Sequence, residues 1–242
     1  MKKEYVYILV TYILMLLSGA IGYPVLYYAG VNVFHEPADS MRTLTPPLWT
    51  VISFIIGLII VLYLLRKAAK KETDRAEPLP AAPSAIWAIS GVFLCFFAQT
   101  AAAIIESLFG APAVSNNTQQ IMALIERFPL VILISSIAGP ILEEIVFRKI
   151  IFGTLRRRFS FLLSGIVSSV IFGLAHTEPS HLFLYSLLGL TLAYLYEKTN
   201  RITVSMFAHV SMNTIVVVRL LLHPSVLQTS VHEIYSSIGG LL

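Results

Sequence analysis

The chain has 242 residues, of which 57% are hydrophobic and only 12% are charged, and its formal net charge is +4. This composition, together with several uncharged runs long enough to cross a bilayer, excludes an ordinary soluble domain and predicts a multispanning helical membrane protein. The single cysteine, Cys95, excludes an intrachain disulfide and a cysteine-based zinc cluster. The basic residues lie in short loops between apolar segments, so membrane topology explains the positive charge, and we expect no nucleic-acid partner.

The lengths of the charge-free runs predict an all-α fold, a polytopic transmembrane bundle of about seven (six to eight) helices. The expected spans are 5–29, 46–65, 84–108, 129–155, 160–176, 181–197 and 202–222. The first span lacks a small-residue cleavage site after a short apolar core, so we expect a retained helix rather than a signal peptide. The chain has no internal repeat, which weakens the alternative of a transporter built from duplicated halves.

A charged segment with three prolines, KETDRAEPLPAAPS at 71–84, predicts a cytoplasmic loop. It divides the chain into an N-terminal transmembrane hairpin with its loop (1–83), a helical core (84–222) and a C-terminal tail (223–242). The sequence NNT at 116–118 matches a glycosylation acceptor, but we expect only a polar outer loop there.

Lysine and arginine gather on the cytoplasmic side of membrane proteins, and their distribution predicts the orientation of this chain. If the N-terminus is inside, only Arg42, Arg127 and Arg219 fall at outer positions. The inner positions hold Lys2, Lys3, Arg66, Lys67, Lys70, Lys71, Arg75, Lys149, Arg156, Arg157, Arg158, Lys198 and Arg201. We therefore expect a multi-pass protein of the cell membrane with a cytoplasmic N-terminus.

The stretch ILEEIVFR at 141–148 places three charges inside a very apolar region. Ionisable groups at membrane depth are costly, so each is a candidate functional residue. On a helix, Glu144 and Arg148 share one face, whereas Glu143 points about 100° away from Glu144. We expect Glu144 and Arg148 to form a structural ion pair, which leaves Glu143 without a partner.

Further polar side chains occur on two of the spans that follow, 160–176 and 202–222. Phe172 and His176 share one helix face, and His209 and Asn213 share another. Either histidine alone would more often be a packing residue, but together with Glu143 and Asn213 they indicate a site. Such a group can activate water and stabilise an oxyanion, or two histidines and a glutamate can hold zinc with an open water position.

Three short stretches, EEIVFR (143–148), FGLAH (172–176) and HVSMN (209–213), resemble the EExxxR, FxxxH and HxxxN motifs of the CPBP family. This family, also called Abi, comprises CAAX proteases and bacteriocin-processing or self-immunity proteins. The resemblance covers residues 128–218 and implies an intramembrane endopeptidase with a core of several helices.

The resemblance also implies roles for individual residues. The residues concerned are the catalytic Glu143, His176, His209 and Asn213 and the site-organising Glu144, Arg148 and Phe172. Glu143 and His176 would activate the attacking water, and His209 and Asn213 would stabilise the oxyanion. A metalloprotease of this type would hold zinc with Glu143, His176 and His209; a metal-free glutamate mechanism is the alternative.

The function and the substrate both have alternatives. A non-catalytic membrane immunity or binding protein, or a proton-coupled carrier, could retain the same polar residues. As partners we expect the lipid bilayer and a peptide or membrane-associated substrate. We do not expect a prenylated substrate, because the short loops and compact size are typical of bacterial chains.

Glu106, Glu178 and His181 are expected at the outer interface, although Glu178 and His181 could instead support the site.

Overall fold

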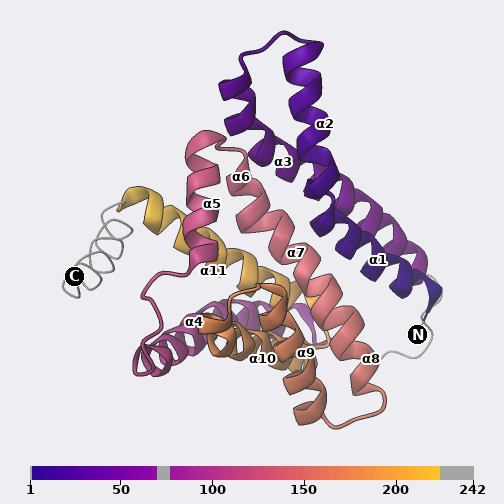
Figure 1. The fold of residues 1–242 in the computed structure, drawn as a ribbon. Helices are drawn as coiled ribbons and strands as arrows, with labels where there is room; N and C mark the ends of the chain where they lie inside the picture. Colours follow the sequence, from indigo (N-terminus) through magenta and orange to yellow (C-terminus); the bar gives the residue numbers. More distant parts are fainter. Residues whose placement is uncertain (1, 70–76, 224–242) are drawn as a thin grey trace.

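The computed structural model describes residues 2–69 and 77–223, and all regular structure in these two ranges is helical (Figure 1). The helices are α1 Lys3–Leu17, α2 Gly19–Asn32, α3 Ala38–Ala69, α4 Ala81–Ser107, α5 Asn116–Arg127, α6 Val131–Leu133, η1 Ile134–Ala138, α7 Gly139–Glu143, η2 Glu144–Phe152, α8 Gly153–Arg156, α9 Phe161–Ala175, η3 Pro179–His181, α10 Leu182–Thr199 and α11 Ile202–Leu222. Residues 71–76 of the loop expected at 71–84 lie outside the described residues, and 81–84 form the first turn of α4. All but the first residue of the expected C-terminal tail also lie outside the described residues.

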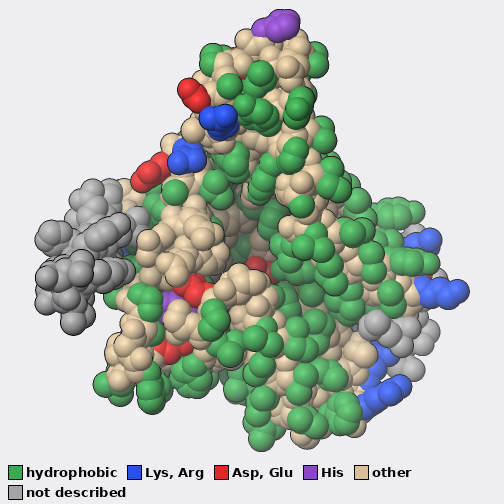
Figure 2. All heavy atoms as spheres, viewed as in Figure 1, with side chains coloured by type: hydrophobic (Ala, Val, Ile, Leu, Met, Phe, Trp, Pro, Cys, Tyr) green, Lys and Arg blue, Asp and Glu red, His purple; other side chains and the backbone are tan. Residues whose placement is uncertain are grey.

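Each of the seven expected spans is helical, which confirms the all-α membrane bundle. By length and composition, α3, α4 and α11 could each cross a membrane. The pair α1 and α2, bent by 49° at its break, would make a fourth if it is a single span. The other expected spans are shorter or are interrupted, and hydrophobic side chains cover much of the surface (Figure 2).

The helix that carries ILEEIVFR runs through α6, η1, α7, η2 and α8 as one rod (Figure 1). Two of its segments, η1 and η2, are π-helical rather than α-helical. Pro140 has no N–H to donate, and proline interrupts the regular hydrogen-bond ladder of a helix. Single-turn π-bulges inside helices are frequent at functional sites, and the longer segment η2 begins at Glu144, contains Arg148 and directly follows Glu143.

The N-terminal hairpin packs on this rod and does not form a core of its own. Ile8 and Tyr12 of α1 are buried in the same hydrophobic cluster as Ile145 and Phe147 of η2. The rings of Tyr12 and Phe147 meet edge to face with centroids 6.0 Å apart. The hairpin therefore forms one wall of the region that contains the charged residues.

Small residues allow α9 and α10 to approach closely. A Cβ on Gly189 of α10 would lie 3.0 Å from Cβ of Ser169 and 3.2 Å from Cδ1 of Phe172. A Cβ on Gly173 would lie 2.7 Å from Oγ of Ser186. This contact fixes the C-terminal end of α9, where His176 lies.

The NNT sequence begins helix α5, so the prediction of a polar loop at 116–118 was wrong. Ser115 caps this helix by accepting a hydrogen bond from the backbone N–H of Thr118 at 3.0 Å. Met122 and Ile125 form its buried face. A search for long charge-free runs cannot find such a helix, because an amphipathic surface helix keeps its polar residues.

Candidate active site

The buried ion pair expected between Glu144 and Arg148 is present. The Nε atom of Arg148 lies 3.4 Å from Oε1 of Glu144, and the two side chains are 1% and 0% exposed. The Arg148 guanidinium also lies over the ring of Phe172, 4.3 Å from its centroid. Because none of its three nitrogens hydrogen-bonds to a described residue, charge and the aromatic ring hold Arg148.

His209 of α11 lies between the two adjacent glutamates. Its Nδ1 is 3.1 Å from Oε1 of Glu144, and its Nε2 is 3.7 Å from Oε2 of Glu143. Since an ionised carboxylate only accepts hydrogen bonds, Nδ1 carries a proton and donates it to Glu144. This bond turns Nε2 toward Glu143. We had expected Arg148 alone to engage Glu144, so the second role of Glu144 was missed.

The two glutamates differ in their access to solvent. The side chain of Glu143 is 21% exposed, whereas that of Glu144 is fully buried. The separation of 3.7 Å between Glu143 and His209 is longer than a hydrogen bond. Glu143 is therefore the carboxylate of the pair that water and a substrate can reach.

His176 follows the last residue of α9 and is fixed by its own helix. Its Nδ1 lies 2.8 Å from the carbonyl oxygen of Phe172, which can only accept, so Nδ1 carries a proton. In the neutral form of such a ring, Nε2 has the lone pair. The ring centroid of Phe172 lies 4.6 Å from that of His176 and 6.0 Å from that of His209. Phe172 thus contacts both histidines and Arg148.

Asn213 lies one turn beyond His209 on α11. Its Nδ2 donates to the backbone oxygen of Ser135 in η1 at 3.3 Å. The structure therefore brings Glu143, Glu144, Arg148, His209 and Phe172 into direct contact. His176 joins this group through Phe172, and Asn213 adjoins it through the neighbouring π-helical segment.

Tyr185 of α10 stacks on His176 and was missed in the sequence. The two ring centroids are 3.9 Å apart and the planes are inclined by 20°. The hydroxyl of Tyr185 lies 3.3 Å from Oε2 of Glu178 and 3.3 Å from Oγ of Ser115. One uncharged tyrosine in an apolar span gives no signal in the sequence, although the nearby Glu178 and His181 indicated that polar residues there could support the site.

Glu106, Glu178 and His181, which the sequence analysis expects at the outer interface, have buried side chains. They are only 7%, 7% and 4% exposed. Oε2 of Glu106 lies 2.8 Å from Nδ1 of His181, and Oε1 accepts from the backbone N–H of Leu184 at 2.8 Å. The N-terminal turn of α10 has free N–H groups, and Glu106 supplies an acceptor from a different helix.

A catalytic zinc site needs three protein ligands gathered around one position. Among residues 2–69 and 77–223, no three His, Cys, Asp or Glu side chains gather closely enough to hold a metal. Glu143 and His209 face each other, but His176 adjoins them only through Phe172. These three side chains, as arranged, do not fit a preformed three-ligand zinc site.

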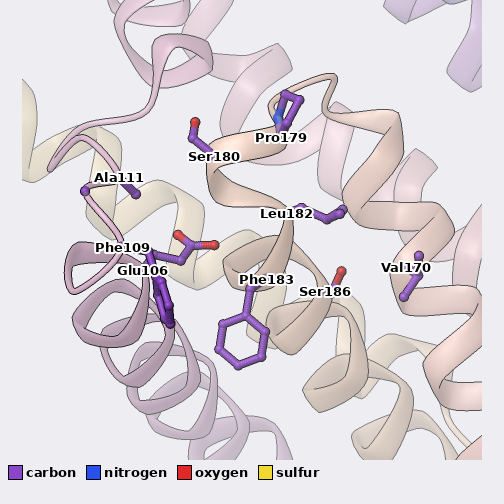
Figure 3. Close-up of a pocket in the computed structure, with 10 residues that line it drawn as sticks. Glu106, Phe109, Ala111, Val170, Pro179, Ser180, Leu182, Phe183 and Ser186 are labelled. Carbon is purple, nitrogen blue, oxygen red and sulfur yellow. The ribbon is translucent and has the colours of Figure 1, made fainter.

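A cavity of about 590 Å³ lies between the C-terminal end of α4, α9 and the start of α10 (Figure 3). Its lining residues are Glu106, Phe109, Gly110, Ala111, Val170, Pro179, Ser180, Leu182, Phe183 and Ser186. None of the seven residues expected in the site is among them. This cavity is therefore separate from the cluster around His209.

Comparisons with known proteins agree on one family. The family model described as "Type II CAAX prenyl endopeptidase Rce1-like" matches residues 125–215, which contain all seven expected site residues. No solved structure matches the chain.

Three curated relatives are similar to the chain. "Putative membrane peptidase YdiL" of Bacillus subtilis is 43% identical over 100% of this chain and 99% of its own length. "Membrane-embedded CAAX protease MroQ" of Staphylococcus aureus is 31% identical over 73% of each chain. "UPF0177 protein YxdF" of Lactococcus lactis is 32% identical over 46% of this chain and 58% of its own. The chain therefore belongs to the Rce1-like family of type II CAAX prenyl endopeptidases and is a membrane protease.

Proposed function

We propose that this protease hydrolyses a peptide bond within the membrane region by means of water activated by Glu143 and His176. The observation that carries the proposal is the position of His209. Glu144 orients its ring, and its Nε2 faces the solvent-accessible Glu143. A buried, oriented imidazole beside an accessible carboxylate is the arrangement that general acid–base catalysis requires.

The attack on the substrate begins at Glu143. Its carboxylate takes a proton from water while the water oxygen bonds to the carbonyl carbon, and the carbonyl electron pair moves to oxygen. Nε2 of His176 accepts a hydrogen bond from the same water, because Nδ1–H is already donated to Phe172. General-base assistance of this kind contributes about 10²- to 10⁴-fold to the rate.

His209 and Asn213 stabilise the oxyanion that results. Donation from Nε2 to the oxyanion requires a proton on that nitrogen as well as on Nδ1. Asn213 uses one Nδ2–H for Ser135 and has a second to donate.

The reaction ends with cleavage of the C–N bond. The oxyanion pair re-forms the carbonyl as the C–N bond breaks, and Glu143 returns its proton to the leaving nitrogen, so the side chain is ionised again. The products are an amine and a carboxylic acid, and transfer of the acid proton to the amine gives an ammonium and a carboxylate. Glu144 and Arg148 exchange no proton in this scheme. They hold His209 and Phe172 in place, which is the site-organising role that the motif resemblance implies.

We propose the metal-free glutamate route over zinc, because Glu143, His176 and His209 are not gathered as three ligands. If zinc is bound, these residues would hold it, and the ion would polarise the carbonyl and activate water. With zinc bound, the proton transfers proposed for Glu143 and His176 would be the part of the scheme that changes.

The substrate and the orientation are also proposals. The printed names of YdiL and MroQ favour a protease over a non-catalytic immunity protein. We propose a peptide or membrane-anchored protein as substrate.

Lys and Arg side chains gather near the N-terminal end and α8 (Figure 2), and Nζ of Lys2 donates to the backbone oxygen of Ala68 at 3.1 Å. This shared basic end supports a cytoplasmic N-terminus.

The test is cleavage of a quenched fluorescent peptide library by the full chain in lipid nanodiscs. Glu143→Ala, His176→Ala and His209→Ala should each abolish cleavage while the protein stays folded. Glu197→Ala is the control, because it removes a glutamate from a partly exposed ion pair with Arg156 and should retain activity. Undiminished cleavage by Glu143→Ala would overturn the proposal.

A further inference from the structure

We propose that Tyr185 is a positioning residue for His176 and that Glu178 holds Tyr185 in place. This proposal rests on the function proposed above, in which Nε2 of His176 must point at the attacking water. Tyr185 and Glu178 lie outside the three motifs. The first observation is the parallel stack of the two rings, with centroids 3.9 Å apart.

The imidazole of His176 needs a second restraint. Its hydrogen bond from Nδ1 to the carbonyl oxygen of Phe172 fixes one ring atom but leaves the ring free to swing about that bond. The ring of Phe172 meets it at 68°, and the face of Tyr185 covers it at 20°. Stacking from Tyr185 therefore blocks the remaining rotation and keeps Nε2 in one direction.

Tyr185 is itself restrained at its hydroxyl. Oε2 of Glu178 accepts from this hydroxyl at 3.3 Å, and Oε1 of Glu178 accepts from the backbone N–H of Asn116 at 2.6 Å. A buried carboxylate is costly unless its oxygens are hydrogen-bonded, and both oxygens of Glu178 have such a partner. Glu178 thus provides a fixed anchor for Tyr185.

The anchor joins two segments distant in the sequence. Asn116 is the first residue of α5, and Ser115, its N-cap residue, also lies within 3.3 Å of the Tyr185 hydroxyl. The position of His176 therefore depends on the loop after α9, on α10 and on the start of α5. Packing alone would need only the apolar ring of Tyr185 and would not require these polar contacts.

Tyr196 offers a matched control on the same helix. It is 8% exposed, as Tyr185 is, and it packs edge-on against Phe152 at 6.2 Å. It lies 11 residues further along α10, or about 16 Å along the axis. A substitution of Tyr196 removes the same buried aromatic group at a distance from His176.

The experiment measures kcat and KM for one peptide selected from the library, with the full chain in nanodiscs. Tyr185→Leu should lower kcat about tenfold or more, because a misplaced catalytic group costs rate. KM should stay within about twofold, because His176 acts on water and not on substrate binding. Tyr185→Phe keeps the ring and should lose only about threefold. Tyr196→Leu should leave kcat near the wild-type value.

Two results would overturn the proposal: equal kcat for the two leucine variants, or a Tyr185→Leu effect confined to KM.

A second readout does not depend on activity. Nitrogen NMR of ¹⁵N-histidine-labelled protein, with His176→Ala for assignment, should show one Nδ1-protonated tautomer for His176 in the wild type and in Tyr185→Phe. Tyr185→Leu should leave Nδ1 protonated but shift and broaden the Nε2 resonance as the ring swings, and an unchanged Nε2 resonance would contradict positioning. If the wild type cleaves no peptide, the proposed function fails, while this spectrum still decides the role of Tyr185.

Discussion

The Nδ1 atom of His209 lies 3.1 Å from Oε1 of Glu144, so the buried member of the glutamate pair orients this histidine. The accessible member, Glu143, faces the other ring nitrogen. Two adjacent and chemically identical side chains thus differ in both burial and contacts. Glu144 is fully buried and is held by Arg148 and His209, whereas Glu143 is 21% exposed and lies 3.7 Å from His209.

The first prediction separates stability from activity in the buried ion pair. Arg148→Met should destabilise the protein by about 3–5 kcal/mol, because it leaves the Glu144 charge buried without its cation. Glu144→Leu combined with Arg148→Met removes both charges and should recover most of that loss. The double variant should nevertheless be inactive, because Nδ1 of His209 loses its acceptor. Thermal unfolding and peptide cleavage measure the two effects, and an active double variant would refute the orienting role of Glu144.

The second prediction concerns the residue after His176. Thr177 has φ +53°, a left-handed conformation that β-branched residues rarely adopt. Thr177→Gly should raise the free energy of unfolding by about 0.5–1 kcal/mol, since relief of strain exceeds the added flexibility of the unfolded chain. Asn200, with φ +53°, is the control, because asparagine tolerates this conformation and Asn200→Gly should be nearly neutral. Calorimetry in detergent measures both, and equal shifts would argue against strain at Thr177.

The third prediction tests the contact between α9 and α10. Gly189→Ala places a Cβ 3.0 Å from Cβ of Ser169 and 3.2 Å from Phe172. It should cost about 1–3 kcal/mol of stability and reduce cleavage, because Phe172 contacts both histidines. Gly153→Ala is the control: its Cβ would meet only the Arg148 oxygen, at 3.5 Å, so a gain of up to about 1 kcal/mol is expected. A Gly189→Ala protein with full activity and stability would contradict this packing.

The fourth prediction addresses the metal. Because Glu143, His176 and His209 are not gathered as three ligands, cleavage should survive dialysis against a strong chelator. Elemental analysis of the same active preparation should find far less than one zinc per chain. Activity that is lost on chelation and restored by stoichiometric zinc would favour the metal route instead. Glu197→Ala treated in parallel controls for general effects of the chelator.

Much of the fold could be predicted because its signals are local. A largely uncharged apolar run of sufficient length predicts a spanning helix whatever its neighbours, and all seven runs identified in this way are helical. The pairing of Glu144 with Arg148 also follows from helical spacing within one segment. The faces shared by Phe172 with His176 and by His209 with Asn213 rest on the same period.

The missed features depend on contacts between distant segments. Glu178 is bound by Asn116, which is 62 positions away, and His181 is bound by Glu106, which is 75 away. No local pattern contains this information. The dual engagement of His209 was missed for another reason: α-helical spacing puts adjacent glutamates about 100° apart, but imidazole presents a nitrogen on each of two edges.

The shared core of the hairpin and the site limits how this protein can be divided. Tyr12 meets Phe147 at 6.0 Å, and Phe147 meets Phe172 at 5.1 Å, so three rings connect α1 to the residue between the two histidines. Residues 125–215, which define the family, lack the first of these rings. In a chimera between relatives, Tyr12 and Phe147 must therefore be exchanged together, and the hairpin is not an interchangeable membrane anchor.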